Sequence, residues 1–529
     1  MIKRLFKFSS SSITSAALLL GVASFLSRLL GLLRARIFAN RFGAGLDLDM
    51  YYAAFRIPDL VFSIIIMGAV SSAFIPIFTE TRIKKKDHWR LANNFLHSFS
   101  LLVLLVSVLL IIFAPHLVRL IAPGFDLEAQ TMTILLTRIM LIQPILLSVS
   151  GILSGILQSY KIFFAYALSP IMYNVGIITG ALFLVPKFGI IGLAWGVVLG
   201  ALLHLLIQIP SLSSCKFKYR PVFDLKDKLM RKVIKLTIPR SISLAALQIN
   251  YIAITAIAST LVAGSIAIFN YANDIQYVPL GLIGIAYAAA AFPSLTKSHA
   301  EGNKKELKDT FSKTFLEIIY LVLPITVLLF VLRHEITGVL LQTGEFGREE
   351  MFLTSAAIGI FCIGIPFQSL VPFLSRTFFA IQNTVIPLIV NLISTAINIS
   401  LAIYLVRLPN LFASISLPGD KRILALPLAL SLAAIVNVLL LLTFLLVKLK
   451  GIKITSLLLS ISKFLLINAL LFTVILLIKN VAYQYFSQSV LSMLTIGLIS
   501  GGTGLLLYFA LSYVLKIEEA KSITKVFKR

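Results

Sequence analysis

Charged residues are scarce in this sequence. Only 13% of its 529 residues are Asp, Glu, Lys or Arg, whereas 59% are hydrophobic. Soluble globular domains carry about 25% charged residues, so the composition excludes a soluble globular protein. Runs of about 20 apolar residues, the length that crosses a bilayer core of about 30 Å, recur from end to end. The sequence therefore predicts an all-α polytopic membrane protein.

The residues that build most catalytic and metal sites are also few. The two cysteines, Cys215 and Cys362, give no disulfide framework and no CxxC motif, and the six histidines form no HExxH or paired arrangement. No GxxxxGK[ST] nucleotide loop and no nucleophile–base pair occurs. We therefore expect no enzyme, no metal site and no cofactor, and a driving force taken from an ion gradient or from the membrane potential.

Acidic residues are fewer than basic ones, and the net charge is +26. The basic residues lie in short loops and tails between apolar runs, which is how membrane topology is encoded, so we expect no nucleic-acid partner. The N-terminus "MIKRLFKFSSSSITSAALLLGVASFL" has the basic and apolar parts of a signal peptide. It runs into the next helix without a convincing small-residue cleavage site, which favours a first membrane helix.

Apolar runs between charged or Pro/Gly-rich breaks predict about fourteen spans. Basic loops such as "TRIKKKDHWR" and "KSHAEGNKKELKD" fall on one face, which should be cytoplasmic, together with both termini. The predicted spans are 13–38, 50–78, 94–122, 129–157, 161–185, 189–212, 236–262, 266–296, 313–340, 352–380, 384–407, 422–447, 455–478 and 489–515.

Two halves of the chain resemble each other at matching positions. Pro76 in "SSAFIPIFTE" corresponds to Pro293 in "AAAFPSLTKS", and "PIMYN" from Pro170 corresponds to "PLIVN" from Pro387, each pair 217 residues apart. Six spans fit that interval, which preserves orientation and predicts a parallel repeat of two lobes around a cavity, typical of alternating access. The predicted domains are an N-lobe at 1–212, a basic cytoplasmic linker at 213–235, a C-lobe at 236–447, and two C-terminal helices with a basic tail at 448–529.

The first predicted span carries four arginines. An arginine facing lipid at mid-depth costs about 2.5–3.5 kcal/mol on insertion scales, so we expect Arg28 and Arg34 to face a cavity. Guanidinium groups bind phosphate bidentately, which favours an anionic, phosphate-bearing ligand. Arg36 and Arg41 lie near the helix end, where we expect them to reach the headgroups as anchors.

Two acidic residues near the second span are candidate site residues, and the first of them has two interpretations. Asp49 is either an N-terminal acid of that helix or a partner of the arginines when no ligand is bound. Arg56 and Asp59 flank Pro58 and pair across a break in the helix in one interpretation.

Asp274 lies within an apolar region of the eighth span, which by default marks a functional site. The alternative is a salt bridge with Arg376 or Arg240, both of which can equally lie at the cytoplasmic mouth. Intramembrane amides favour hydrogen bonds between helices over an ion site; these are Asn250, Asn391 and Asn398.

The stretch "SRLLGLLRARIFANRFGAGLDLDMYYAAFRIPDL" resembles the MurJ (MviN) family of lipid II flippases in the MOP exporter superfamily. "NYANDIQYVPLGLIGIAYAAAAFPSLTKS" and "LSRTFFAIQNTVIP" resemble later motifs of that family, so the likeness covers essentially the whole chain. It implies a MOP/MATE-like fold of two six-helix lobes plus two C-terminal helices.

The resemblance also implies a function. Members of that family move undecaprenyl-pyrophosphate-linked peptidoglycan precursor from the inner to the outer leaflet of the bacterial inner membrane, through a cationic cavity. The family's first-helix arginines match Arg28 and Arg34, and its acid before the second helix matches Asp49. Lipid II and membrane lipids are the implied partners.

Three positions depart from the family pattern. A second-helix arginine of many members falls on Phe62, a nearby glutamate on Met67, and a cationic position of the eighth helix on Asp274. Arg56 and Arg376 are the candidates to compensate. The alternative functions are export of another polyprenyl-linked saccharide or of a small cationic compound, and a membrane scaffold without transport.

Overall fold

The structure is a computed structural model that describes residues 13–84, 87–408, 410–452, 454–486 and 489–520, with only the backbone described at 13–18, 71–72, 239 and 243. Every regular element in these ranges is a helix. Thirteen described segments are long and apolar enough to cross a membrane. They correspond to the second to fourteenth predicted spans, and the first lies in α2 (Ile13–Phe42). The predicted polytopic all-α class is confirmed.

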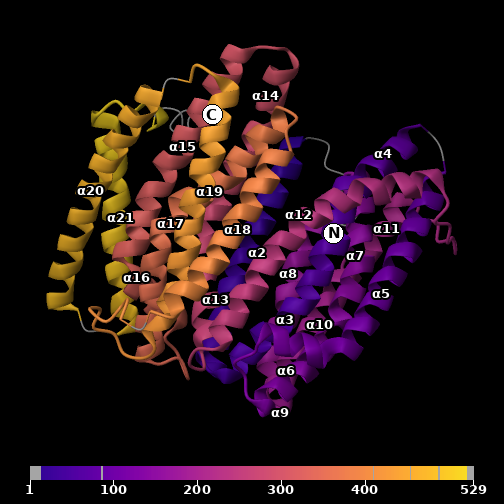
Figure 1. Ribbon diagram of the computed structural model, residues 1–529, viewed down its shortest axis with the longest axis horizontal. Coiled ribbons are helices and arrows are strands. Elements are labelled where there is room, and N and C mark those ends of the chain that lie inside the picture. The colour runs from indigo at the N-terminus through magenta and orange to yellow at the C-terminus, as the bar shows by residue number, and fades with distance from the viewer. Residues whose placement is uncertain (1–12, 85–86, 409, 453, 487–488, 521–529) are drawn as a thin grey trace. The chain divides into compact units, whose positions relative to one another are not determined.

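The helices divide into two compact units, Met1–Ala267 and Ile268–Arg529, whose boundary falls within α13 (Ser265–Pro279). In Figure 1 the colour follows the chain from indigo at the N-terminus to yellow at the C-terminus. The predicted seventh span lies in the first unit, so the predicted lobe boundaries stay a prediction. After α2 the first unit contains α3 (Leu46–Val61), η1 (Phe62–Met67), η2 (Val70–Phe74), α4 (Ile75–Ile83), α5 (His88–Ile121), α6 (Leu127–Met140), α7 (Ile142–Ser159), α8 (Phe163–Thr179), η3 (Gly180–Leu184), α9 (Val185–Phe188), α10 (Ile190–Leu206), α11 (Ile209–Leu212), η4 (Ser213–Cys215) and α12 (Lys228–Ser259).

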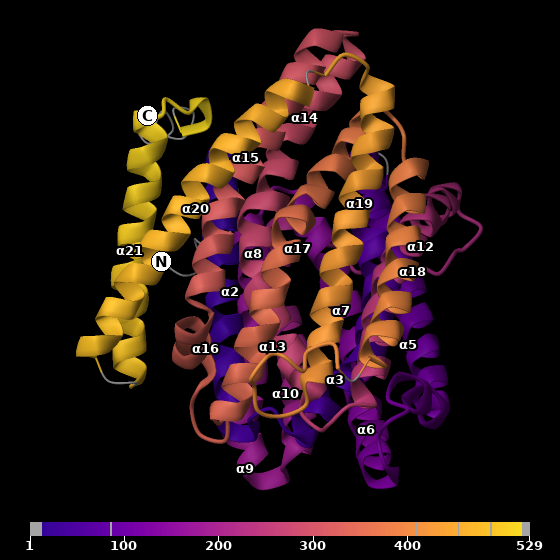
Figure 2. The ribbon, with the colours of Figure 1, turned by 60° about the vertical axis from the view of Figure 1, so that its left-hand side comes forward.

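The second unit continues from α13 through the two C-terminal helices. Its elements are η5 (Leu280–Ile285), α14 (Ala286–Ala300), α15 (Lys304–Val331), α16 (Arg333–Leu341), α17 (Arg348–Ala380), α18 (Val385–Val406), η6 (Lys421–Leu424), α19 (Ala425–Leu449), α20 (Ile454–Tyr485) and α21 (Val490–Val514). Within this unit α20 and α21 pack against each other, and α20 also packs on α15, as both ribbon views show (Figure 1, Figure 2).

Short polar side chains begin several of the long helices. Each accepts hydrogen bonds from backbone N–H groups of the first turn, which no carbonyl of the helix can satisfy. The capping residues are Asp87, Asp126, Asp227, Asn303 and Ser489. The helix starts that follow polar loops are therefore fixed by sequence.

The second and eighth spans each contain a π-helical segment. The segment η1 begins at Phe62 and η5 begins at Leu280, 218 residues later (62 to 280), within one residue of the predicted repeat offset. A π-helical turn frees backbone carbonyls and is frequent at functional sites. The shared position of η1 and η5 supports a parallel repeat, whereas η2 and η3 correspond to α-helical segments of the second half.

Glycines bring α8, η3 and α10 into close contact. A Cβ on Gly176 would overlap the backbone of Gly200, and a Cβ on Gly180 would overlap that of Gly196. Helices in membranes associate through such small-residue stripes because lipid gives no hydrophobic drive to helix pairing. The stripes fix α8, which carries Tyr173, a residue of the site described next.

Candidate functional site

The arginines of α2 differ in burial along the helix. Arg28, Arg34 and Arg36 are half-buried, whereas Arg41 in the last turn is exposed. The guanidinium carbon of Arg34 lies 5.9 Å from the centroid of the Phe38 ring, within the range of cation–π attraction. The exposure of Arg41 fits the expected anchor at the helix end, and the half-buried positions of Arg28 and Arg34 keep part of both side chains against protein.

Contacts from α2 to its neighbours place these arginines in the first unit. Asn174 on α8 donates a hydrogen bond to the hydroxyl of Ser27, with 3.3 Å between Nδ2 and Oγ. The Phe38 ring meets the edge of Tyr51 on α3 at a centroid distance of 5.4 Å. The helix therefore packs between α8 and α3 at the turns that carry Arg28 and Arg34.

Arg56 links α3 to α12. Its Nε donates to Thr255 Oγ1 at 2.8 Å, and its guanidinium carbon lies 5.4 Å from the Tyr251 ring centroid. The sequence suggested Asp59 as the partner of Arg56 and gave no sign of Thr255, which is 199 residues away.

The contact of Arg56 belongs to a polar seam, which we define as Thr255, Gln248 and Ser241 on α12 with their partners on the second span. Gln248 donates to Ser63 Oγ at 2.8 Å, and Ser241 donates to the carbonyl oxygen of Ile64 at 2.5 Å. The three α12 residues are seven apart, so they share one face of the helix. The acceptor carbonyl of Ile64 lies in η1, where π-helical turns free such groups.

Asp59 is half-buried one turn after Arg56, so the two side chains lie on the same face of α3. The charges of Arg56 and Arg34 both act on its carboxyl group, and the Asp59 charge acts in turn on Tyr173. The Tyr173 hydroxyl is buried and has no hydrogen-bond partner in the described part of the chain. Two guanidinium groups, one carboxyl group and one hydroxyl group without a partner thus lie within electrostatic range of one another, and this cluster is suited to an anion with several oxygen acceptors.

Asp49 lies in the first turn of α3, as one of the two interpretations of the sequence expected, but its carboxylate bonds to the start of another helix. Its carboxylate is 2% exposed and accepts from the backbone N–H groups of Gly264 and Ala267, both at 2.7 Å. These amides open α13, so Asp49 satisfies the N-terminal donors of another helix, where negative charge is favoured. Gly264 has φ +92° and a Cβ there would overlap the Ala44 carbonyl oxygen, so glycine is required. The contacts show a structural role, and substrate binding by Asp49 stays a prediction.

The second unit carries the remaining predicted site residues. Asp274 is exposed on α13, and Arg376 is half-buried on α17. Gln368 on α17 donates to Gln276 on α13 with 3.3 Å between Nε2 and Oε1, a link that sequence analysis missed. Binding of substrate by Asp274 or Arg376 stays a prediction.

A hydrogen bond between amides joins α18 to α19. Asn437 Nδ2 donates to Asn391 Oδ1 at 2.9 Å. The expected helix-joining role of Asn391 is confirmed. Within the described ranges no three His, Cys, Asp or Glu side chains lie together as metal ligands.

Residues 38–497 match the family model described as "Lipid II flippase MurJ". The chain belongs to this family. It is 30% identical over 391 residues to the "Probable lipid II flippase MurJ" of Buchnera aphidicola subsp. Schizaphis graminum, covering 72% of this chain and 76% of the relative. It is 29% identical over 437 residues to the "Lipid II flippase MurJ" of Burkholderia cenocepacia, covering 80% and 82%.

Solved structures agree with the MurJ assignment. "Lipid II flippase MurJ, inward closed conformation" superposes with a TM-score of 0.75 at 26% identity, covering 94% of this chain and 99% of that one. An inward-facing MATE transporter of the MOP superfamily gives 0.65 at 16% identity, covering 81% and 96%, which shows a shared fold alone. The resemblance stated from the motifs is thus confirmed.

Two of the three departures from the MurJ pattern fall at the irregular second span, and the third is Asp274 on α13. Phe62 is half-buried and Met67 is exposed, and they begin and end η1. Arg56, six residues before Phe62 on the same span, instead bonds to Thr255. The positive charge of the described cluster therefore comes from Arg34 and Arg56, on α2 and α3.

The second unit contains a buried ion pair that the sequence motifs do not indicate. Glu335 on α16 is 1% exposed; Lys479 Nζ on α20 lies 3.0 Å from its Oε1 and 3.1 Å from its Oε2. The Tyr483 hydroxyl donates to Oε1 at 2.5 Å, and Lys479 also donates to the carbonyl of Val331 at 2.8 Å. Two ionisable residues inside apolar runs were the available signal. This buried cluster joins α20 to α15 and α16.

Proposed function

We propose that the chain is a lipid II flippase, which moves the undecaprenyl-pyrophosphate-linked peptidoglycan precursor from the inner to the outer leaflet of the bacterial inner membrane. Membership of the MurJ family over residues 38–497 carries this proposal. The relatives named lipid II flippases, matched over most of their length, support it. The MATE likeness concerns the fold alone, so it does not favour export of a small cationic compound.

The arginine cluster gives the proposal its chemistry. A pyrophosphate crossing a bilayer loses water, and this cost must be offset by positive charge and hydrogen-bond donors. Arg34 and Arg56 supply guanidinium forks, and the Tyr173 hydroxyl supplies a further donor. Asp59 serves as their counter-ion when no substrate is present. Arg28, one and a half turns before Arg34 on α2, extends the same cationic wall.

Transport follows alternating access in this proposal. The parallel repeat supports two lobes that rock about a substrate site, and an ion gradient or the membrane potential drives the cycle. The polar seam between α12 and the second span suits a contact that opens and closes, because its hydrogen bonds exchange for water at little cost. Both termini and the basic loops lie in the cytoplasm, by the distribution of Lys and Arg.

The test is complementation in a bacterium depleted of its own lipid II flippase, with periplasmic lipid II quantified at equal expression. Wild type is expected to restore export. Arg34→Ala is expected to lower it about tenfold or more, because a charged hydrogen bond is worth about 1.5–3 kcal/mol, and Arg28→Ala tests the same wall. Arg41→Ala, exposed at the helix end, is the matched control and should export normally. Normal export by Arg34→Ala would remove the arginine mechanism.

A further inference from the structure

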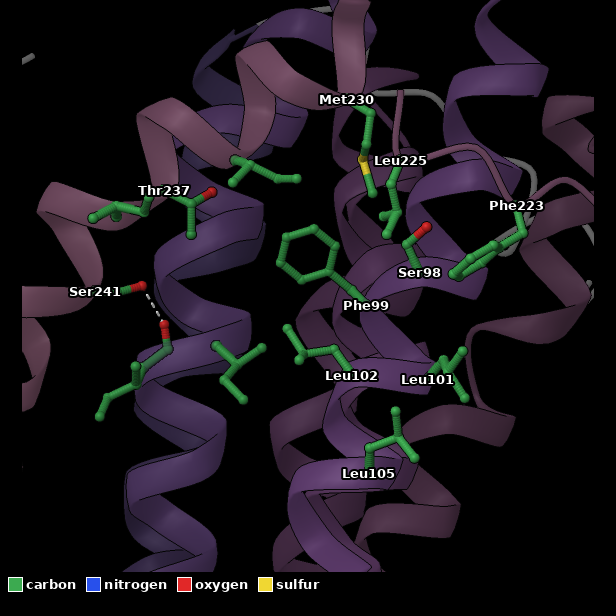
Figure 3. A pocket seen from close by; sticks show the side chains of 14 residues that line it. Ser98, Phe99, Leu101, Leu102, Leu105, Phe223, Leu225, Met230, Thr237 and Ser241 are labelled. Atoms are coloured by element: carbon green, nitrogen blue, oxygen red, sulfur yellow. Dashed lines mark hydrogen bonds between the residues drawn. The ribbon is translucent and has the colours of Figure 1, made fainter. Parts of the chain in front are cut away.

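An apolar groove of about 400 Å³ lies in the first unit, between α5, the second span, α12 and the linker before α12. Figure 3 shows Phe99, Leu102 and Leu105 on one wall and Thr237 and Ser241 on the opposite one. Leu102 and Leu105 are 45% and 59% exposed, so the groove opens sideways from the protein, toward the bilayer.

The lining offers a polar ligand no free hydroxyl donor. Its three hydroxyl groups already donate within the protein: Ser98 to Asn94, Thr237 to the Val233 carbonyl, and Ser241 to the Ile64 carbonyl. A buried polar ligand atom without a partner costs several kcal/mol, whereas a hydrocarbon chain costs nothing of the kind. The lining therefore favours hydrocarbon over a polar ligand.

The linker at the end of the groove is held in a fixed place. Asn94 on α5 donates to the Asp224 carbonyl and accepts from the Asp224 N–H, both at 2.7 Å. His97 bonds to the Val222 carbonyl at 3.1 Å. Phe223 and Leu225, on either side of Asp224, point into the groove (Figure 3) and are nevertheless 57% and 50% exposed. A pinned loop that exposes large apolar side chains among lysines is typical of a membrane interface.

Basic residues follow the lining residues one by one. Lys226 comes after Leu225, Arg231 after Met230, and Lys235 after Ile234. These cations and Lys228 are exposed and form no ion pair with any described residue, whereas neighbouring Lys232 pairs with Glu80. Anionic headgroups of the cytoplasmic leaflet attract such residues by about fivefold in affinity for each Lys or Arg.

We propose that this groove is a binding site for an anionic phospholipid of the cytoplasmic leaflet: one acyl chain lies in the groove and the headgroup phosphate meets the basic residues beside it. The orientation is the one given under Proposed function. Because lipid tails gain little from leaving other lipid tails, the headgroup charge provides the selectivity and the groove fixes the place. The acyl chain in the groove touches Ile64 on the second span and Ser241 on α12. It therefore holds these two helices together at the polar seam.

The experiment is native mass spectrometry of the purified full chain in detergent, titrated with dioleoyl phosphatidylglycerol and, separately, with dioleoyl phosphatidylcholine. Wild type should bind the first phosphatidylglycerol more tightly than phosphatidylcholine. Lys228→Gln/Arg231→Gln should weaken that step about 30-fold. The control Lys304→Gln/Lys305→Gln removes the same charge from exposed residues of the second unit and should bind as wild type does.

A second variant tests the groove itself. Leu102→Trp fills it at a position where the side chain is 45% exposed, so the fold tolerates the change while the acyl chain is excluded. Phosphatidylglycerol should raise the melting temperature of wild type and leave that of Leu102→Trp unchanged. The proposal would be overturned if all variants bound phosphatidylglycerol equally, or if wild type bound the two lipids equally. It would also be overturned if equimolar undecaprenyl phosphate displaced phosphatidylglycerol. These binding assays do not depend on lipid II export. A failure of the flippase proposal would therefore be distinguished from a failure of the lipid-site proposal.

Discussion

Replacing Lys479 by methionine should destabilise the protein strongly. The substitution removes the cation that lies 3.0 Å from Glu335 and leaves a carboxylate that is 1% exposed. Breaking a buried ion pair by removing one partner costs about 3–5 kcal/mol, because the remaining charge stays uncompensated. The Tyr483 hydroxyl still donates to Glu335, so we expect the lower half of that range. The free energy of unfolding in detergent, from denaturant titration, measures the loss.

Two further variants make this prediction specific. Glu335→Leu/Lys479→Met removes both charges and should recover most of the loss, since apolar replacements of buried pairs are often neutral or stabilising. Lys84→Met is the matched control, because the Lys84–Glu80 pair is exposed, with side chains 59% and 47% accessible, and exposed pairs contribute about 0–1 kcal/mol. A loss below about 1 kcal/mol for Lys479→Met, or no recovery in the double variant, would refute the reasoning.

Two predictions concern packing and capping. Gly180→Ala should lower the free energy of unfolding by about 1–3 kcal/mol, because the added Cβ overlaps the backbone of Gly196. The control is Gly502→Ala, whose Cβ meets no atom within 4 Å and which should be neutral or stabilising by up to about 1 kcal/mol. Equal unfolding midpoints of the two variants would exclude this account. Asp49→Asn should lower the free energy of unfolding by about 1–3 kcal/mol, because one of the backbone amides of Gly264 and Ala267 loses its acceptor. Unchanged unfolding together with lost lipid II export would instead assign Asp49 to substrate binding.

The spans could be predicted from the sequence because lipid leaves the backbone no partner outside its own helix. Every crossing segment must therefore be a long apolar helix, and the runs show it directly. The π-helical segments η1 and η5 could not be predicted, since one extra residue in a turn leaves no periodic signal in uniformly apolar sequence. Only the repeat of Pro76 and Pro293 near their ends hinted that the two halves share a feature there.

The site was predictable in part, because the lipid environment also penalises charged side chains. Ionisable residues in apolar helices are costly, so Arg34 and Asp274 stand out by type alone. The partners of other site residues do not, because those contacts join distant parts of the sequence: Arg56 bonds to Thr255, 199 residues away. Asp49 meets backbone amides 215 and 218 residues away, and an amide carries no mark in the sequence. Glu335 and Lys479 did carry a mark, as charges near or within apolar runs.

The central claim is that this chain moves lipid II across a bilayer and that Arg34 takes part. The most direct measurement uses the purified protein in liposomes with lipid II loaded in one leaflet, and follows its appearance in the other. The account predicts transfer by wild type and by Arg41→Ala at the same rate. For Arg34→Ala it predicts a transfer rate lowered by about tenfold or more. Lipid II that stays in its original leaflet with correctly inserted wild-type protein under an imposed membrane potential and ion gradient would contradict it.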